Sequence, residues 1–194
     1  MVYLNDHIEG LDIPQTLRRV SRQRADYALR YRQERDQRLS LAVYLLLMEG
    51  LEKEYGITGQ PEFVFGQHGK PMLKDHPEIH FNLSHCRRAA LCVISSQPVG
   101  CDIETVPEEL DMDVCRYCFN EEEIAGITRS DRPTLTFTQL WTCKEALLKL
   151  TGEGLTNDLP GLLCPPLSET VSFHTHIAPD SSYVYTICQH IGDS

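Results

Sequence analysis

The sequence predicts an α+β protein, built from antiparallel sheets with helices packed on them. Two observations support this class. Residues 18–55 contain no proline and are dominated by residues that favour helices. From residue 62 the pattern changes to short segments in which apolar and polar residues alternate between turns, which is typical of antiparallel strands.

The stretch 18–55 is expected to form two helices, the second ending at Gly56. Three strands should then form an antiparallel meander, because turn residues separate them. The middle strand is a continuous apolar run and should be buried on both faces. These strands are residues 79–84, 89–94 and 99–104, and an earlier strand at 63–65 precedes a turn at 69–71.

Two helices and a hairpin are expected in the rest of the chain. Asn120 should cap the first helix, with Glu123 at the capping-box position. The second helix should cover residues 135–150 and end at Gly152. Two alternating segments, 170–177 and 182–189, are predicted to form the hairpin.

The charge of the chain excludes one class of partner. Acidic residues outnumber basic ones, 28 against 18, and the formal net charge is −10, which argues against a broad basic surface for nucleic acid. The exception is the stretch 18–38, where eight arginines and three acidic residues give a local charge of +5. The longest apolar run, residues 41–48, is too short to span a bilayer, so we expect a cytoplasmic protein with no membrane segment.

The eight cysteines are expected to be mostly reduced core residues, because several lie inside apolar strand or helix patterns. Cys115 and Cys118 form one C-x-x-C motif without a second pair at zinc-ribbon spacing. A zinc or thiol site at this motif is therefore the weakest of the functional alternatives.

Asp102 and Glu104 are the first candidate site residues. Side chains at i and i+2 of a strand project from the same face, so the two carboxylates should stand side by side. Adjacent carboxylates repel each other unless a cation lies between them, and an oxygen-lined site of this kind suits Mg²⁺. Taken alone, the pattern is more often an exposed acidic face.

The helix at 135–150 carries a second candidate group. Glu145 and Lys149 are an i, i+4 pair on its polar side, where a surface ion pair is the usual interpretation. Lys144 instead falls inside the apolar arc of the helix, where an ammonium must reach around to solvent or meet a buried anion. This misplaced lysine favours a functional site.

Ser84 and His85 close the strand at 79–84. A serine hydrolase is excluded, because neighbouring strand residues point to opposite faces and no G-x-S-x-G motif is present. A strand end that offers a hydroxyl, an imidazole and backbone N–H groups can hold a phosphate instead. A structural role for His85 remains an alternative.

Taken in order along the chain, these segments resemble the 4′-phosphopantetheinyl transferase superfamily, of the longer, Sfp-like type. The resemblance covers residues 69–149, and the Trp-x-x-Lys-Glu-Ala form is nearer the W/KEA branch than the F/KES branch. The segments that carry it are Gly69-Lys-Pro71, Phe81-Asn-Leu-Ser-His85, Val99-Gly-Cys-Asp-Ile-Glu104, Phe119-x-x-x-Glu123 and Trp141-Thr-Cys-Lys-Glu-Ala-x-x-Lys149.

The resemblance implies a fold and an activity. The fold is a monomer of two similar α+β halves, residues 1–98 with coenzyme phosphate contacts and residues 99–194 with the metal and the catalytic helix. The activity is transfer of the 4′-phosphopantetheine arm from coenzyme A to a serine of an apo acyl or peptidyl carrier protein, which releases 3′,5′-ADP. The alternative is a non-catalytic module that binds coenzyme A or a carrier protein on the same fold.

The resemblance also implies roles for individual residues. Mg²⁺, or Mn²⁺, would be held by acids that match Asp102, Glu104 and Glu145. Glu145, or a metal-bound water that it orients, would take the proton of the carrier serine, and Lys149 would stabilise or protonate the leaving phosphate. The positions that match coenzyme-binding residues are Lys70, Ser84, His85, Lys144 and Arg38. By hypothesis, the basic stretch 18–38 faces the polyanionic coenzyme and the acidic carrier.

Overall fold

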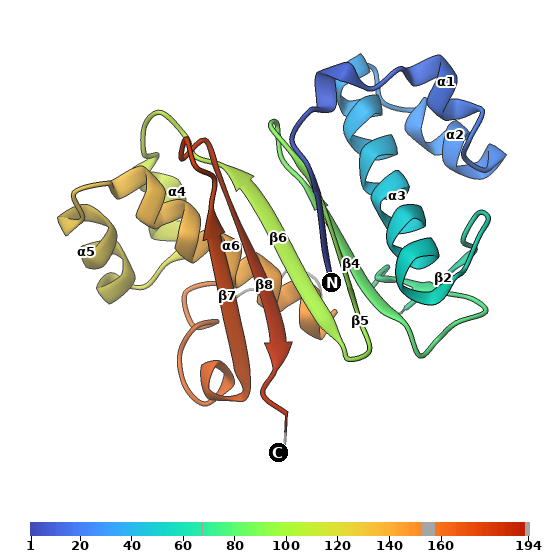
Figure 1. The fold of residues 1–194 in the computed structure, drawn as a ribbon. Coiled ribbons are helices and arrows are strands. Elements are labelled where there is room, and N and C mark those ends of the chain that lie inside the picture. The colour runs from blue at the N-terminus through green and yellow to red at the C-terminus, as the bar shows by residue number, and fades with distance from the viewer. Residues whose placement is uncertain (67, 153–157, 193–194) are drawn as a thin grey trace.

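The computed structural model describes residues 1–66, 68–152 and 158–192, and it confirms an α+β architecture with helices packed on antiparallel sheets (Figure 1). The elements are β1 (Val2–Asn5), a 3₁₀ turn (Ile8–Gly10), α1 (Ile13–Leu17), α2 (Arg22–Ala28), α3 (Glu34–Tyr55), β2 (Phe63–Phe65), β3 (Pro71–Leu73), β4 (His80–His85), β5 (Ala90–Ser95), β6 (Val99–Thr105), α4 (Met112–Cys118), α5 (Glu121–Arg129), α6 (Pro133–Thr151), a second 3₁₀ turn (Leu167–Thr170), β7 (Val171–Ile177) and β8 (Tyr183–His190).

The first sheet has the order β1-β5-β4, with all neighbours antiparallel. Its central strand β5 is buried from Ala90 to Ile94, as the continuous apolar run predicts. Helix α3 packs its apolar residues against this sheet, and it ends at Gly56, which adopts the left-handed conformation with φ of 65°. Strands β2 and β3 form a separate two-stranded hairpin, and the Gly69-Lys70-Pro71 turn lies between them and runs into β3.

The meander prediction is wrong at its third strand. The strand forms as β6, but it pairs with β8 in a second sheet of order β6-β8-β7. Strand β6 lies beside β4 without a backbone ladder, and the Asn82 side chain bridges them by accepting a hydrogen bond from the Cys101 N–H at 2.9 Å. The free edge of β5 is taken by β1, which the sequence analysis did not assign.

Helix α6 crosses the second sheet and contacts β6 at very close range (Figure 1). Gly100 makes this approach possible, because a Cβ atom there would lie 2.0 Å from the Ala146 carbonyl oxygen. The capping box of Asn120 and Glu123 opens α5, and Gly152 ends α6 in the left-handed conformation, both as predicted.

The cysteines behave as small core residues. All eight are free, and six of them, including Cys115 and Cys118, are buried. Within residues 1–66, 68–152 and 158–192, no three His, Cys, Asp or Glu side chains form a ready metal centre, so a zinc site at the C-x-x-C motif finds no support there. Across the same ranges, no helix combines the length and apolarity that crossing a membrane requires.

Candidate active site

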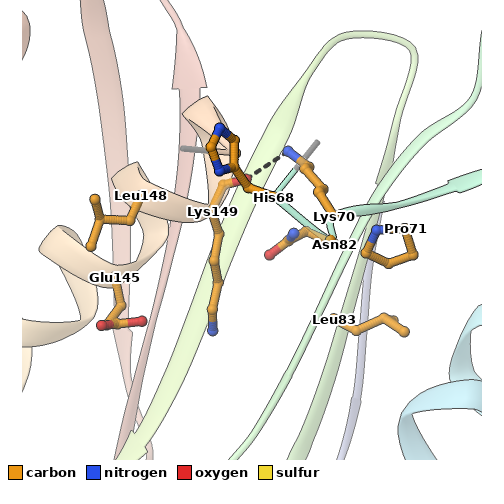
Figure 2. A pocket seen from close by; sticks show the side chains of 10 residues that line it. His68, Lys70, Pro71, Asn82, Leu83, Glu145, Leu148 and Lys149 are labelled. Carbon is orange, nitrogen blue, oxygen red and sulfur yellow. Dashed lines mark hydrogen bonds between the residues drawn. The ribbon is translucent and has the colours of Figure 1, made fainter. Parts of the chain in front are cut away.

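A cavity of about 330 Å³ lies between the Gly69-Lys70-Pro71 turn, strand β4 and helix α6. Glu145 and Lys149 line its α6 side (Figure 2). Their spacing of four residues puts both side chains on one face of the helix. The i, i+4 pair noticed in the sequence therefore faces this cavity.

Lys149 reaches from the cavity wall to a buried carboxylate. Its Nζ lies 2.5 Å from Asp102 Oδ1 and 3.0 Å from Ser84 Oγ, and the Ser84 hydroxyl donates to Asp102 Oδ1 at 2.8 Å. Burial alone would lower the pKa of Lys149, but the contact with Asp102 outweighs burial and raises it. Lys149 is thus held as a cation at the junction of β4, β6 and α6.

Three carboxylates surround this cation. Burial, followed by the charges of Asp102 and Glu145, raises the pKa of Glu104 to about 7, against the opposing effects of the Lys149 charge and a hydrogen bond from Trp141. Burial, followed by the charge of Asp102, also raises the pKa of Glu145. One ammonium therefore does not compensate all three acids.

The donor set fits a hard divalent cation. Asp102 Oδ2 is buried and accepts no hydrogen bond from any residue in the described part of the chain. An unpartnered carboxylate oxygen next to two further acids is the kind of group that Mg²⁺ binds, together with water and phosphate. The three acids do not form a closed three-ligand cage among the described residues, so the assignment of Asp102, Glu104 and Glu145 as ligands stays a prediction.

Lys144 does not lie in this cavity, which corrects the expectation that it contacts a coenzyme phosphate. Its side chain is fully buried, with Nζ 2.8 Å from Glu123 Oε2 and 2.8 Å from the Leu159 carbonyl oxygen. It also donates to the Cys118 carbonyl at 3.0 Å and lies over the Phe119 ring. The misplaced lysine does meet a buried anion, but that anion is a residue of the protein.

Lys70 lines the cavity, and its ammonium points toward α6 (Figure 2). Its Nζ donates to the carbonyl oxygens of Lys149, Leu150 and Val99 at 2.6, 3.1 and 3.2 Å. Burial lowers its pKa. A direct contact of Lys70 with coenzyme phosphate would have to replace one of these bonds.

The structure separates the remaining predicted positions. Ser84 joins the Asp102 cluster, and His85 ends β4 beside it, where burial and the Lys149 charge lower the pKa of the imidazole. Arg38 does not reach either cavity: it donates to the Leu11 carbonyl at 3.1 Å and pairs with Glu34 at 2.9 Å. Its assignment as a coenzyme-binding residue therefore stays a prediction.

Arg24, which belongs to the basic stretch 18–38 but was not among the predicted site residues, lines a second cavity of about 280 Å³. Its guanidinium lies over the Tyr27 and Tyr44 rings, 5.0 and 5.2 Å from their centroids, and one of its nitrogens bonds Ser40. The two cavities share Gly69, Pro71 and Leu83, so they adjoin along the same turn. The available signal was Ser21, a helix cap that places Arg24 at the third position of α2.

Comparison with known proteins gives consistent matches. Residues 98–190 match the family described as the 4′-phosphopantetheinyl transferase superfamily. The chain is 28% identical over 140 residues to 4′-phosphopantetheinyl transferase Sfp of Bacillus subtilis (strain 168), which covers 71% of this chain and 62% of that protein. It is 29% identical over 184 residues to 4′-phosphopantetheinyl transferase psf-1 of Bacillus pumilus, covering 87% and 78%. It is 32% identical over 139 residues to 4′-phosphopantetheinyl transferase gsp of Aneurinibacillus migulanus, covering 70% and 57%. The matched region is thus less than two thirds of the length of Sfp.

Proposed function

Because the chain belongs to the 4′-phosphopantetheinyl transferase superfamily, we propose that it transfers the 4′-phosphopantetheine arm of coenzyme A to a serine of an apo acyl or peptidyl carrier protein. The products are the holo carrier protein and 3′,5′-ADP. The observation that carries this proposal is the group of Asp102, Lys149 and Ser84, with the charges of Glu104 and Glu145 nearby, next to a cavity that Lys149 and Glu145 line.

The acidic side chains supply the metal site in this proposal. Asp102, Glu104 and Glu145 would hold Mg²⁺ or Mn²⁺, and the unpartnered Asp102 Oδ2 is the oxygen best prepared to do so. When bound, the cation supplies neutralisation of the coenzyme diphosphate and polarisation of the phosphorus that is attacked.

The residues of α6 handle the proton and the leaving group. Glu145 accepts the proton of the carrier serine, and its raised pKa suits a base that works near neutral pH. Lys149 remains a cation and stabilises the negative charge that develops on the departing 3′,5′-ADP. Both groups lie on one helix face, so they act on the same phosphorus centre from a common support.

The two adjoining cavities suggest how the coenzyme lies. Its diphosphate would occupy the cavity at Lys149, near His85, and its nucleotide end the second cavity, where Arg24 and the faces of Tyr27 and Tyr44 suit a phosphorylated nucleoside. The halves 1–98 and 99–194 would then hold the coenzyme between them in a monomer. The arginines of the stretch 18–38 would attract the coenzyme and an acidic carrier.

Mass spectrometry of the carrier tests this function. After incubation with coenzyme A, Mg²⁺ and an apo carrier protein, the carrier should gain the mass of one phosphopantetheine. The variant Glu145→Gln should lose transfer while keeping the melting temperature close to that of the wild type, whereas Glu122→Gln, an exposed position on α5, should change neither. If coenzyme A raises the melting temperature but no carrier from a representative panel is modified, the non-catalytic module is the correct interpretation.

A further inference from the structure

The Lys70 side chain joins two parts of the molecule that are distant in sequence. It comes from the turn before β3, and its three acceptors belong to the start of β6 and the end of α6. A lysine ammonium has three N–H donors, and here each one meets a backbone carbonyl. The turn is thereby tied to both elements that carry the catalytic acids and Lys149.

The position of these acceptors at a helix end gives the contact its strength. The last carbonyl groups of a helix have no N–H partner within the helix, and together they carry a partial negative charge. Lys149 and Leu150 lie in the last turn of α6, which ends at Thr151 and is capped by Gly152. A cation placed there donates hydrogen bonds to these carbonyls and also interacts favourably with the negative end of the helix dipole.

One of the bound carbonyls belongs to Lys149 itself. The backbone of Lys149 is held from one side by Lys70 at 2.6 Å, while its ammonium is held by Asp102 at 2.5 Å. Both ends of this residue are therefore fixed. A shift of the last turn of α6 would move the Lys149 side chain and change the wall of the cavity at the same time.

We propose that Lys70 is a positioning residue, which clamps the last turn of α6 and so sets the place of Lys149, instead of binding the phosphates of the coenzyme. A phosphate ligand needs a donor that points into the cavity, and the Lys70 donors are directed at Val99, Lys149 and Leu150. The clamp is a property of the fold and holds whether or not the chain is a transferase.

Hydrogen exchange of the isolated protein, without coenzyme or carrier, tests the clamp. Lys70→Met keeps the aliphatic stem and removes the donors, so the amides of residues 146–152 should exchange on the order of 10-fold faster, since opening of a local segment sets their rate. Lys74→Met is the matched control, because that lysine follows β3 and pairs only with exposed Glu62. It should leave these amides unchanged. Equal exchange in Lys70→Met and wild type would overturn the proposal.

Kinetics separate the clamp from a phosphate ligand, and this part of the test rests on the proposed function. Lys70→Met should lower kcat by about 10-fold or more, as expected for a misplaced catalytic group, while the affinity for 3′,5′-ADP changes less than about 2-fold. Lys70→Arg, which retains charge and donors, should recover part of both the exchange protection and kcat. The opposite pattern, weaker binding of 3′,5′-ADP with unchanged exchange and kcat, would identify a phosphate ligand.

The clamp can still be tested if Lys70→Met fails to fold or if the wild-type protein shows no transfer. If Lys70→Met does not fold while Lys74→Met does, exchange in the milder variant Lys70→Gln, which loses the charge and shortens the side chain, decides: faster exchange confined to residues 146–152 supports the clamp, and wild-type rates overturn it. If the wild-type protein modifies no carrier, the proposed function fails, and the exchange experiment still tests the clamp alone.

Discussion

Two lysines of α6 show how the same type of side chain serves two different purposes in one helix. Lys144 and Lys149 are five residues apart, and each pairs with one carboxylate at short distance. The Lys144 side chain is 0% exposed and its partner Glu123 12% exposed, whereas Lys149 is 29% exposed above a partner that is only 3% exposed. The first cation is sealed inside the protein, and the second lies on the wall of a cavity.

The surroundings of the two pairs differ in the number of acids nearby. Each pair keeps one buried carboxylate oxygen without a hydrogen-bond partner among the described residues, Oε1 of Glu123 and Oδ2 of Asp102. Lys144 is enclosed by Glu123 and by backbone carbonyls, so its donors are used within the fold. Beside Lys149, two further acids, Glu104 and Glu145, have raised pKa values. The comparison teaches that one cation opposite one carboxylate holds structure together, whereas one cation among three carboxylates leaves negative charge that a ligand can compensate.

The largest effect is expected when the pair of Lys144 and Glu123, called here the sealed pair, is broken. Lys144→Met should lower the free energy of unfolding by about 3–5 kcal/mol, because Glu123 would remain buried without its cation. Chemical denaturation measures this loss. Combining it with Glu123→Gln, which can keep the capping box, should restore part of the stability.

A matched exposed pair provides the control for this prediction. Lys53→Met removes the partner of Glu49 on the surface of α3, and it should cost less than about 1 kcal/mol. If Lys144→Met were equally mild, the buried pair would not be a structural element.

Lys149→Met tests the pair of Lys149 and Asp102, called here the open pair, and should mainly lower the rate of transfer. Transfer should fall on the order of 100-fold to 1000-fold, because a cation at the developing negative charge is lost. In chelator the variant should also melt lower than the wild type, since Asp102 stays buried without its partner. Added Mg²⁺ should recover this melting temperature by binding the carboxylates.

The same addition of Mg²⁺ distinguishes the two lysines. It should not recover Lys144→Met, because the partner of Lys144 is the single carboxylate of Glu123, whereas Asp102 is accompanied by Glu104 and Glu145. Recovery of both variants, or of neither, would contradict the division into a sealed pair and an open one.

The smallest effect is a pH dependence of stability that originates at the open site. The folded protein raises the pKa of Glu104 from 4.5 to about 7, so between these values the folded state binds a proton that the unfolded chain releases. The free energy of unfolding contributed by Glu104 therefore falls as pH rises from about 4.5 to about 7. In chelator, the melting temperature of wild type relative to Glu104→Gln should decrease across this range. A flat difference would mean that the carboxylate is not destabilised in the fold.

Local patterns predicted most of the elements because each depends on neighbouring residues. The capping box at Asn120, the helix ends at Gly56 and Gly152, and the buried run of β5 all appear as expected. Strand pairing was less predictable. An alternating strand such as β6 carries no mark of its partner, and β6 pairs with β8, which follows it far along the chain.

The candidate site was likewise predicted where it depends on local spacing and not where it depends on distant contacts. The spacing of Asp102 with Glu104 and of Glu145 with Lys149 indicated shared faces. In the structure, Glu145 and Lys149 line the cavity, and the Lys149 ammonium connects it to Asp102, whose charge acts on Glu104. Lys144 was correctly noticed as a lysine in an apolar arc, but its partner lies 21 residues away on α5 and meets it only when α5 packs on α6.

The sequence by itself determined the local periodicity, the helix ends, the overall charge and the order of motifs that identifies the superfamily, because these follow from residues close together in the chain. Only the tertiary structure decided which charged residue meets which partner. Lys70 binds helix carbonyls, Lys144 binds Glu123, Lys149 binds Asp102, and Arg24 instead of Arg38 faces a cavity. The physical reason is that the role of a charge depends on its burial and on the groups around it, and both are set by contacts between elements distant in sequence.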